Sequence, residues 1–153
     1  MQAIQTILHP TDFCERCEEA FQLACSRARE QEARLVVLHV APPPVYGMLR
    51  ILVHEYEELW NKLQRLRAPD DLVRLEHLLR CGDPTQEILR SARALCCNLI
   101  VMGTHGRTWL GRLLKSSVAQ GVIRAAPCAV LTTPTALPTW KQAAARRVAA
   151  TVP

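Results

Sequence analysis

Two short stretches of the 153-residue chain combine residue types that suit a phosphorylated ligand. The first is His9-Pro10-Thr11-Asp12, and the second begins at Gly103-Thr104-His105-Gly106-Arg107 and ends at Ser116-Ser117. Glycines let a ligand approach the main chain closely, and the N–H groups that open a helix attract anions. Because Arg107, Arg112 and Lys115 add positive charge, the second stretch suits a phosphate group.

The hydrophobic pattern predicts five strands that alternate with four helices. Strands are expected at residues 3–8, 35–40, 73–81, 99–102 and 128–133, and helices at 13–31, 49–66, 84–97 and 117–125. This order predicts an α/β fold, an open five-stranded parallel sheet with helices on both faces. Ligands of such sheets bind beyond the carboxyl ends of the strands, where the strand order reverses, and both stretches follow strands there.

Local signals set the expected helix starts. Asp12 with Glu15 resembles an N-cap and its reciprocal partner for the first helix. Asp83 followed by Pro84 predicts the start of the third helix. The second helix has an apolar stripe, which comprises Leu52, Tyr56, Leu59, Trp60, Leu63 and Leu66.

Length and composition favour one globular domain over residues 1–133, with 49% apolar and 22% charged residues. Residues 134–153 hold three prolines and an Ala/Arg segment, and we expect a partly disordered or helical extension. The apolar runs fall far short of the roughly 18 residues of a membrane span, and the N-terminus shows no secretion signal. A cytoplasmic location is therefore expected, with no membrane partner.

Charge is distributed unevenly along the chain. Residues 1–80 carry ten basic and twelve acidic side chains, whereas residues 81–153 carry nine basic and two acidic ones. The excess of basic side chains in residues 81–153 favours an anionic partner, or it is simply a solvated basic surface. Nucleic acid is the less favoured partner, because the sequence shows no reading helix, aromatic stacking platform or known motif.

The seven cysteines are an odd number, and reduced thiols are the expected state. Cys14-x-x-Cys17 invites a redox or zinc interpretation, but a zinc site would need further ligands, and no second pair at a suitable spacing exists. On the predicted first helix, Cys17 falls near the centre of the apolar face and Cys14 at its edge. Packing of these thiols in the core is therefore the favoured interpretation.

The stretch LIVMGTHGRTWLGRLLKSSVAQGVIRAAPCAVLTT resembles the C-terminal signature of the universal stress protein family. ILHPTDF and the later Gly-Asp-Pro turn resemble its other markers, so the resemblance spans about residues 3–133. It implies the strand order 3-2-1-4-5, a homodimer and, in one branch, ATP binding through G-x2-G-x9-G-[S/T]. In this chain Gly103 and Gly106 match that motif, but Ser116 stands in place of its third glycine, before Ser117. Asn98, where the family more often has an acid, is interpreted as structural.

The resemblance also implies a set of nucleotide contacts and a dimer strand. Near the base and ribose it implies Pro10, Thr11, Asp12 and Val40; along the ribose and phosphates Met102, Gly103, His105, Gly106 and Arg107; and at the helix start Ser116, Ser117 and Val118. The last strand, with Cys128, Ala129, Val130, Leu131 and Thr132, would be an apolar edge that pairs with a second copy. The cofactor would be ATP, or ADP or AMP, with or without Mg²⁺.

Each of these residues also has a structural interpretation. Asp12 could serve only as a helix cap, and Ser117 with Gln120 has the spacing of a capping box, which would use an N–H that a phosphate needs. The two glycines could serve a tight turn, and His105 could make one structural hydrogen bond. Val40 and Met102 are compatible with a core position whatever binds.

Three functions follow from these patterns. The first is a dimeric, ATP-binding stress-response module with little or no turnover, since no side chain near the expected phosphates suits a catalytic base. The second is a nucleotide-free dimer of the same family that acts through protein–protein interaction, with Ser116 marking a lost site. The third is binding of nucleic acid or another polyanion by the basic half. A P-loop NTPase is rejected, because Arg112 and Leu113 stand where that motif needs lysine and a hydroxyl.

Overall fold

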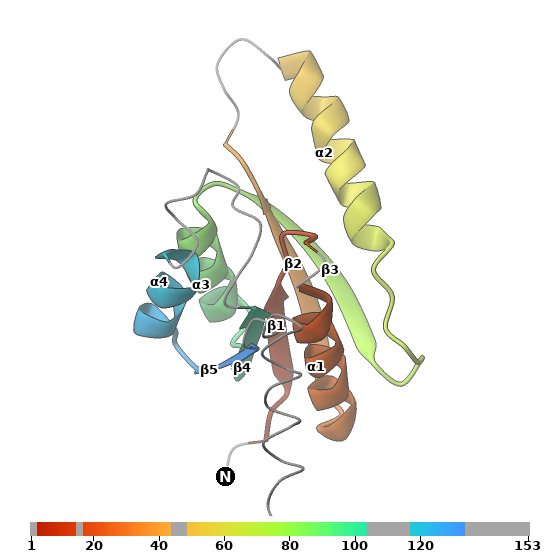
Figure 1. Cartoon of the computed structure of the whole chain (residues 1–153), viewed down its shortest axis with the longest axis vertical. Coiled ribbons are helices and arrows are strands. Elements are labelled where there is room, and N and C mark those ends of the chain that lie inside the picture. Colours follow the sequence, from red (N-terminus) through yellow and green to blue (C-terminus); the bar gives the residue numbers. More distant parts are fainter. Residues whose placement is uncertain (1–2, 15–16, 44–48, 104–116, 134–153) are drawn as a thin grey trace, which may run out of the picture.

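Five parallel strands form the centre of the structure, a computed structural model that describes residues 3–14, 17–43, 49–103 and 117–133. The strands are β1 (Thr6–Pro10), β2 (Arg34–Ala41), β3 (Arg74–Cys81), β4 (Leu99–Gly103) and β5 (Ala129–Thr133). The helices are α1 (Cys17–Glu30), α2 (Leu49–Gln64), α3 (Pro84–Ala94) and α4 (Ser117–Ala125). The sheet order is β3-β2-β1-β4-β5, which confirms the predicted fold and strand order (Figure 1). The extension at residues 134–153 lies outside the described residues.

The two faces of the sheet bury two separate apolar clusters. On one face α1 contributes Phe21, Ala24, Cys25 and Ala28, which pack with Ile7, Leu35, Val37, Leu99 and Val101 of the strands. On the other face α3 and α4 contribute Ile88, Ala92, Ala119 and Val122, which pack with Leu8, Val36, Leu38, Ile100 and Met102. Neighbouring residues of one strand enter opposite clusters, as expected for strands that are covered on both sides.

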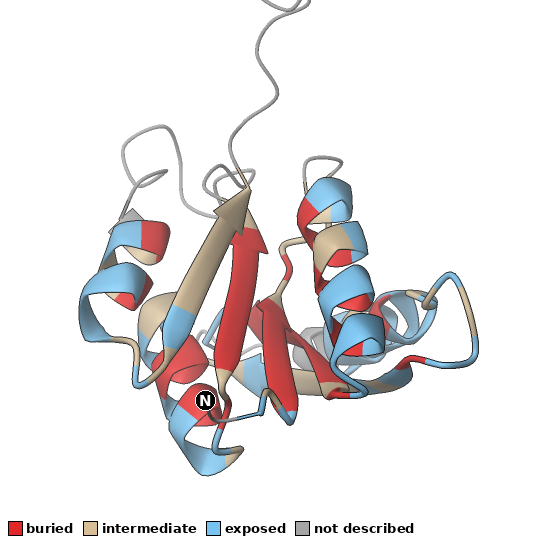
Figure 2. Ribbon diagram, turned by 90° about the horizontal axis from the view of Figure 1, so that it is seen from below, coloured by how far each residue is buried: buried red, intermediate tan, exposed pale blue. Residues whose placement is uncertain are grey.

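Burial is highest in the middle of the sheet and decreases toward its edges. The side chains of Ile7, Leu8, Leu35 and Ile100 are fully buried. Figure 2 shows these central strands in red, whereas β5 is mostly half-buried. In β3 every residue is half-buried or exposed, and His77, Leu78 and Leu79 are three half-buried residues in succession.

Helix α2 departs from its expected packing. Of its predicted stripe, Leu63 is fully buried in the cluster beneath α1, but Tyr56 and Trp60 each keep 36% of their surface exposed. In Figure 1 the helix extends away from the sheet toward its N-terminal end. Among the described side chains of the stripe, the fully buried one lies near the C-terminal end of α2, and the side chain of Leu52 lies outside the described part of the chain.

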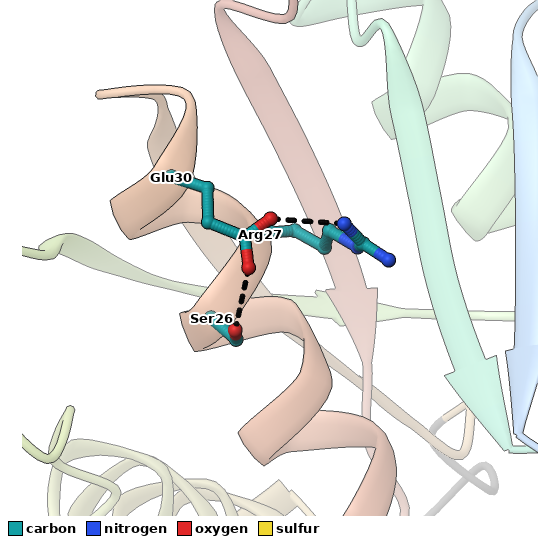
Figure 3. Close-up of polar contacts among 3 residues, drawn as sticks. All are labelled: Ser26, Arg27 and Glu30. Carbon is teal, nitrogen blue, oxygen red and sulfur yellow. Dashed lines mark hydrogen bonds and ion pairs between the residues drawn. The ribbon is translucent and has the colours of Figure 1, made fainter.

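The solvent face of α1 is held by local polar contacts. The Glu30 carboxylate accepts a hydrogen bond from Ser26 Oγ at 3.1 Å and pairs with Arg27 at 2.9 Å (Figure 3). Exposed pairs at this spacing contribute a few tenths of a kcal/mol. These contacts of Glu30 therefore stabilise the helix.

The start of α3 confirms the predicted cap. Asp83 Oδ1 accepts a hydrogen bond from the main-chain N–H of Gln86 at 2.9 Å, and Pro84 occupies the first turn. Asn98 is structural, as predicted, because its Oδ1 accepts from the N–H groups of Gln5 at 2.8 Å and Thr6 at 3.0 Å. These bonds fix the entry to β4 against the start of β1.

Candidate functional site

The strand order reverses between β1 and β4. The chain passes from β1 outward to β2 on one side, and later returns to add β4 on the other side of β1. Connections that leave in opposite directions create a crevice at the carboxyl ends of such strands. Pro10 and Gly103 are the last residues of β1 and β4, so the loop that follows Pro10 opens onto this crevice.

The loop after β1 is a tightly bonded turn and not the first turn of a helix. Thr11 Oγ1 accepts from the N–H of Phe13 at 3.1 Å, and Asp12 Oδ1 accepts from the N–H of Cys14 at 3.0 Å. Phe13 has a φ of 60°, a left-handed conformation that helices do not contain. The predicted helix start at residue 13 is therefore wrong, because Thr11 and Asp12 bond to local N–H groups and delay α1 until Cys17.

Strand β2 anchors this loop from the side. The N–H of Thr11 donates to the carbonyl of Leu38 at 2.8 Å, and the carbonyl of Thr11 accepts from His39 Nδ1 at the same distance. The Phe13 ring packs on the His39 imidazole with centroids 4.3 Å apart, and Lys62 Nζ of α2 lies 4.7 Å from the Phe13 centroid. Burial lowers the pKa of His39, so the imidazole is a neutral donor at neutral pH.

A second histidine joins the ends of β1 and β4. His9 is fully buried, and its Nδ1 lies 2.8 Å from the carbonyl oxygen of Val101. Because a carbonyl can only accept, Nδ1 carries the proton, and Nε2 is then a lone pair without a partner among the described residues. Burial lowers the pKa of His9 to about 4, so the ring is neutral at physiological pH.

The Cys14-x-x-Cys17 pair lies outside the core, contrary to the prediction that these thiols pack there. Both residues are half-buried, with their sulfur atoms 3.0 Å apart, and the Cys17 thiol donates to Asp12 Oδ1 at 2.8 Å. Burial, and then these hydrogen bonds, raises the pKa of the Cys17 thiol. By contrast Cys25 and Cys97 are buried, and burial raises their pKa to about 11 and about 12, which fits the packing role.

The predicted nucleotide contacts that the structure describes lie in the loop after β1, at the end of β4 and in the cluster beneath α3 and α4. Thr11 is buried and Asp12 half-buried in the anchored loop, and Gly103 is half-buried at the end of β4. Val40 and Met102 are buried in the cluster beneath α3 and α4, and Val118 at the start of α4 packs against the same cluster. Helix α4 begins at Ser117 as predicted. His105, Gly106, Arg107 and Ser116, and the side chain of Ser117, lie outside the described residues.

The last strand, which is predicted to pair with a second copy, begins one residue later than expected. Strand β5 begins at Ala129, and Cys128 precedes it and packs against the cluster beneath α3 and α4. Ala129 is exposed, and the following residues of the strand are half-buried. In the sheet that the described residues form, β5 pairs with β4 and is an edge strand.

Sequence reasoning missed His39, Phe13 and Lys62 as residues that shape the site. His39 sits inside the apolar run of β2, where a histidine gives no periodic signal of its own. A polar side chain two residues before the Ala41-Pro-Pro-Pro break was the available clue, since it falls at the carboxyl end of a central strand.

No helix among the described residues is long and apolar enough to cross a membrane. Comparison with known proteins shows that the model of the universal stress protein family matches residues 3–134. Universal stress protein MJ0531 of Methanocaldococcus jannaschii is 33% identical over 135 residues, which is 82% of this chain and 79% of that protein. A universal stress protein of Thermus aquaticus is 32% identical over 132 residues, which is 83% of this chain and 96% of that protein.

Solved structures give the same result. A universal stress protein in complex with cAMP aligns with a TM-score of 0.69 and 25% identity, over 88% of this chain and all of that one. The sequence match and the structural match thus agree with one another. The chain belongs to the universal stress protein family.

Proposed function

We propose that the protein is an adenine-nucleotide-binding universal stress protein, a homodimeric stress-response module with little or no turnover. Its ligand would be ATP, or ADP or AMP, with or without Mg²⁺. The observation that carries the proposal is the anchored Thr11–Asp12 turn at the β1/β4 switch point, which fixes a carboxylate beside the crevice.

Asp12 is suited to hold the ribose. Both hydrogen bonds that the described residues make to its side chain use Oδ1. Oδ2 can therefore accept from a ribose hydroxyl, and a charged acceptor makes a stronger bond than a neutral one. Pro10, Thr11 and Val40 at the ends of β1 and β2 would border the base.

The phosphates would extend from Gly103 toward the start of α4. The first N–H groups of this nine-residue helix, at Ser117 and Val118, have no partner within the helix and attract negative charge. Met102 lies beneath this region in the core, and the resemblance adds His105, Gly106, Arg107 and Ser116. The related structure in complex with cAMP supports a ligand of the adenine-nucleotide class.

This arrangement favours binding over catalysis. Asp12 is the acid nearest the proposed ligand, and it belongs to the ribose end, away from the phosphates. A general base must reach the attacking water beside the phosphate, and no residue is assigned that role. Nucleotide would then be held and released intact.

The dimer would form along β5. This edge strand is short, carries Val130 and Leu131, and has no charged residue between Ala129 and Thr133. Edge strands without such protection pair readily with a second copy about a twofold axis. Sedimentation velocity at micromolar concentration should give a dimer, and a pure monomer would contradict this part of the proposal.

The nucleotide-free dimer is the second candidate, because Ser116 replaces the third glycine of the ATP-binding motif. Equilibrium dialysis of the wild type and Ser116→Gly with ATP, ADP and AMP, with and without Mg²⁺, separates the two candidates. The proposal predicts that the wild type binds and that the substitution leaves its affinity unchanged. A large gain of affinity in Ser116→Gly would instead favour a site that this chain has lost.

A further inference from the structure

Cys14 and Cys17 form, with Asp12, a cluster of which the nucleotide proposal uses the Asp12 carboxylate and neither thiol. One carboxylate oxygen of Asp12 and the two sulfur atoms all lie within 4.8 Å of one another. The sulfur atoms are 3.0 Å apart, and the Cys17 sulfur lies 2.8 Å from Asp12 Oδ1. Among the described residues this is the group in which three metal-ligating side chains converge.

The backbone holds the three side chains in place. Asp12 accepts from the N–H of Cys14 at 3.0 Å, and the N–H of Cys17 donates to the carbonyl of Cys14 at 3.0 Å. The preceding residue, Thr11, is bonded on both sides to β2, through Leu38 and His39. Because these bonds hold residues 11–14 and Cys17, the ligands there lose little conformational freedom when they bind an ion.

The chemistry of these donors selects the ion. Two thiolates and one carboxylate are ligands of Zn²⁺, at about 2.3 Å for sulfur and about 2.0–2.2 Å for oxygen. Thiolates favour thiophilic ions over Mg²⁺ and Ca²⁺, which take oxygen ligands. Sites with three protein ligands keep a fourth position for water or another molecule. The Asp12 carboxylate thus supplies the third ligand that the Cys-x-x-Cys spacing alone lacks.

We propose that Asp12, Cys14 and Cys17 bind a thiophilic divalent cation of the zinc class. Binding converts the two thiols to thiolates and releases their two protons to solvent. The cation then lies between three negative ligands, and the metal–ligand group carries a net charge of −1. Asp12 and Cys17 are half-buried, so an ion can reach the cluster from solvent.

A reactive disulfide pair is the competing interpretation. Cysteines that exchange disulfides readily lie beside a cation or have another feature that favours the thiolate. Here the charged group that is hydrogen-bonded to the Cys17 thiol is a carboxylate, which repels a thiolate but attracts a metal cation. The surroundings of the pair therefore favour metal binding over thiol–disulfide exchange.

The test uses Co²⁺ as a spectroscopic probe on the full chain, in the presence of a phosphine reductant and without oxygen. The wild type should bind one Co²⁺ per chain with thiolate-to-cobalt charge-transfer absorption, and Zn²⁺ should displace it. Cys14→Ser and Cys17→Ser should each lose about half of that absorption and bind at least about tenfold more weakly. Asp12→Asn, which retains an acceptor for the Cys14 N–H, should weaken binding while both sulfur ligands still contribute to the absorption.

Cys96→Ser is the matched control, because Cys96 is an exposed thiol outside the cluster. It should leave the absorption and the affinity unchanged, and circular dichroism should show that every variant is folded. The proposal is overturned if the wild type binds neither ion, or if the cobalt absorption persists in Cys14→Ser/Cys17→Ser. It is equally overturned if tryptic mass spectrometry finds a Cys14–Cys17 disulfide that the reductant does not remove.

Discussion

His39 Nδ1 donates a hydrogen bond to the carbonyl oxygen of Thr11 at a distance of 2.8 Å. The bond joins β2 to the loop that follows β1, at the residue next to Asp12. Without this bond, the carbonyl oxygen of the buried residue Thr11 would lose its hydrogen bond to His39. The orientation of Asp12 thus depends on a histidine that lies 27 residues further along the chain.

Replacing His39 with phenylalanine should loosen this loop. His39→Phe keeps an aromatic ring against Phe13 but removes the donor to Thr11, and a buried acceptor left unsatisfied costs about 1–3 kcal/mol. Urea unfolding should show a loss of stability of that size. His39→Asn places an amide N–H near the position of Nδ1 and should recover part of the lost stability. Equal stabilities for the wild type and the phenylalanine variant would show that the bond does not hold the loop.

His9 should make the stability of the fold depend on pH. Its pKa is about 4 in the folded protein and 6.5 when exposed, so the unfolded chain binds more protons between these values. The free energy of unfolding should therefore be highest above pH 6.5 and should decrease as the pH falls toward 4. The contribution of His9 to this loss amounts to about 2 kcal/mol between pH 7 and pH 5.

The measurement is the free energy of unfolding at pH 7 and pH 5 for the wild type and His9→Asn. The asparagine can still donate toward Val101 but does not titrate, so the variant should lose about 2 kcal/mol less than the wild type over this interval. His54→Asn, which removes an exposed imidazole from α2, should keep the wild-type dependence. If His9→Asn also keeps the wild-type pH dependence of stability, the buried imidazole is not the source of that dependence.

Helix α2 should depend on Leu63 for its attachment. Leu63 is fully buried, whereas Val53 is 57% exposed on the same helix. Leu63→Ala should therefore cost about 2–5 kcal/mol, and Val53→Ala should change stability by less than about 0.5 kcal/mol. Thermal or urea unfolding of both variants checks the difference. Comparable losses would mean that the whole length of α2 is packed in solution.

The sequence predicted the scaffold well because alternation of strand and helix patterns permits few parallel topologies. The buried runs at Leu35 and Leu99, the Asp83 cap and the bonding role of Asn98 all follow from local residue types. Since ligands bind where strand order reverses, the position of the candidate site followed from the fold class and the expected strand order.

The remaining details depend on contacts that no local pattern encodes. The sequence predicts a helix from Phe13, but Thr11 and Asp12 bond to the following N–H groups and turn Phe13 into the left-handed region. The stripe of α2 shows which face is apolar, and it does not show how much of that face the sheet covers. His39 acquires its role only when β2 lies beside the end of β1.

Isothermal titration with ATP is the decisive measurement of nucleotide binding through Asp12. One ATP should bind per wild-type chain, with at least about tenfold weaker binding in Asp12→Asn and unchanged binding in Asp70→Asn. Asp70 is the control because it pairs with Arg29, away from the carboxyl ends of the strands. Absence of heat in the wild type at millimolar ATP, or equal affinity in Asp12→Asn, would show that Asp12 does not bind ATP.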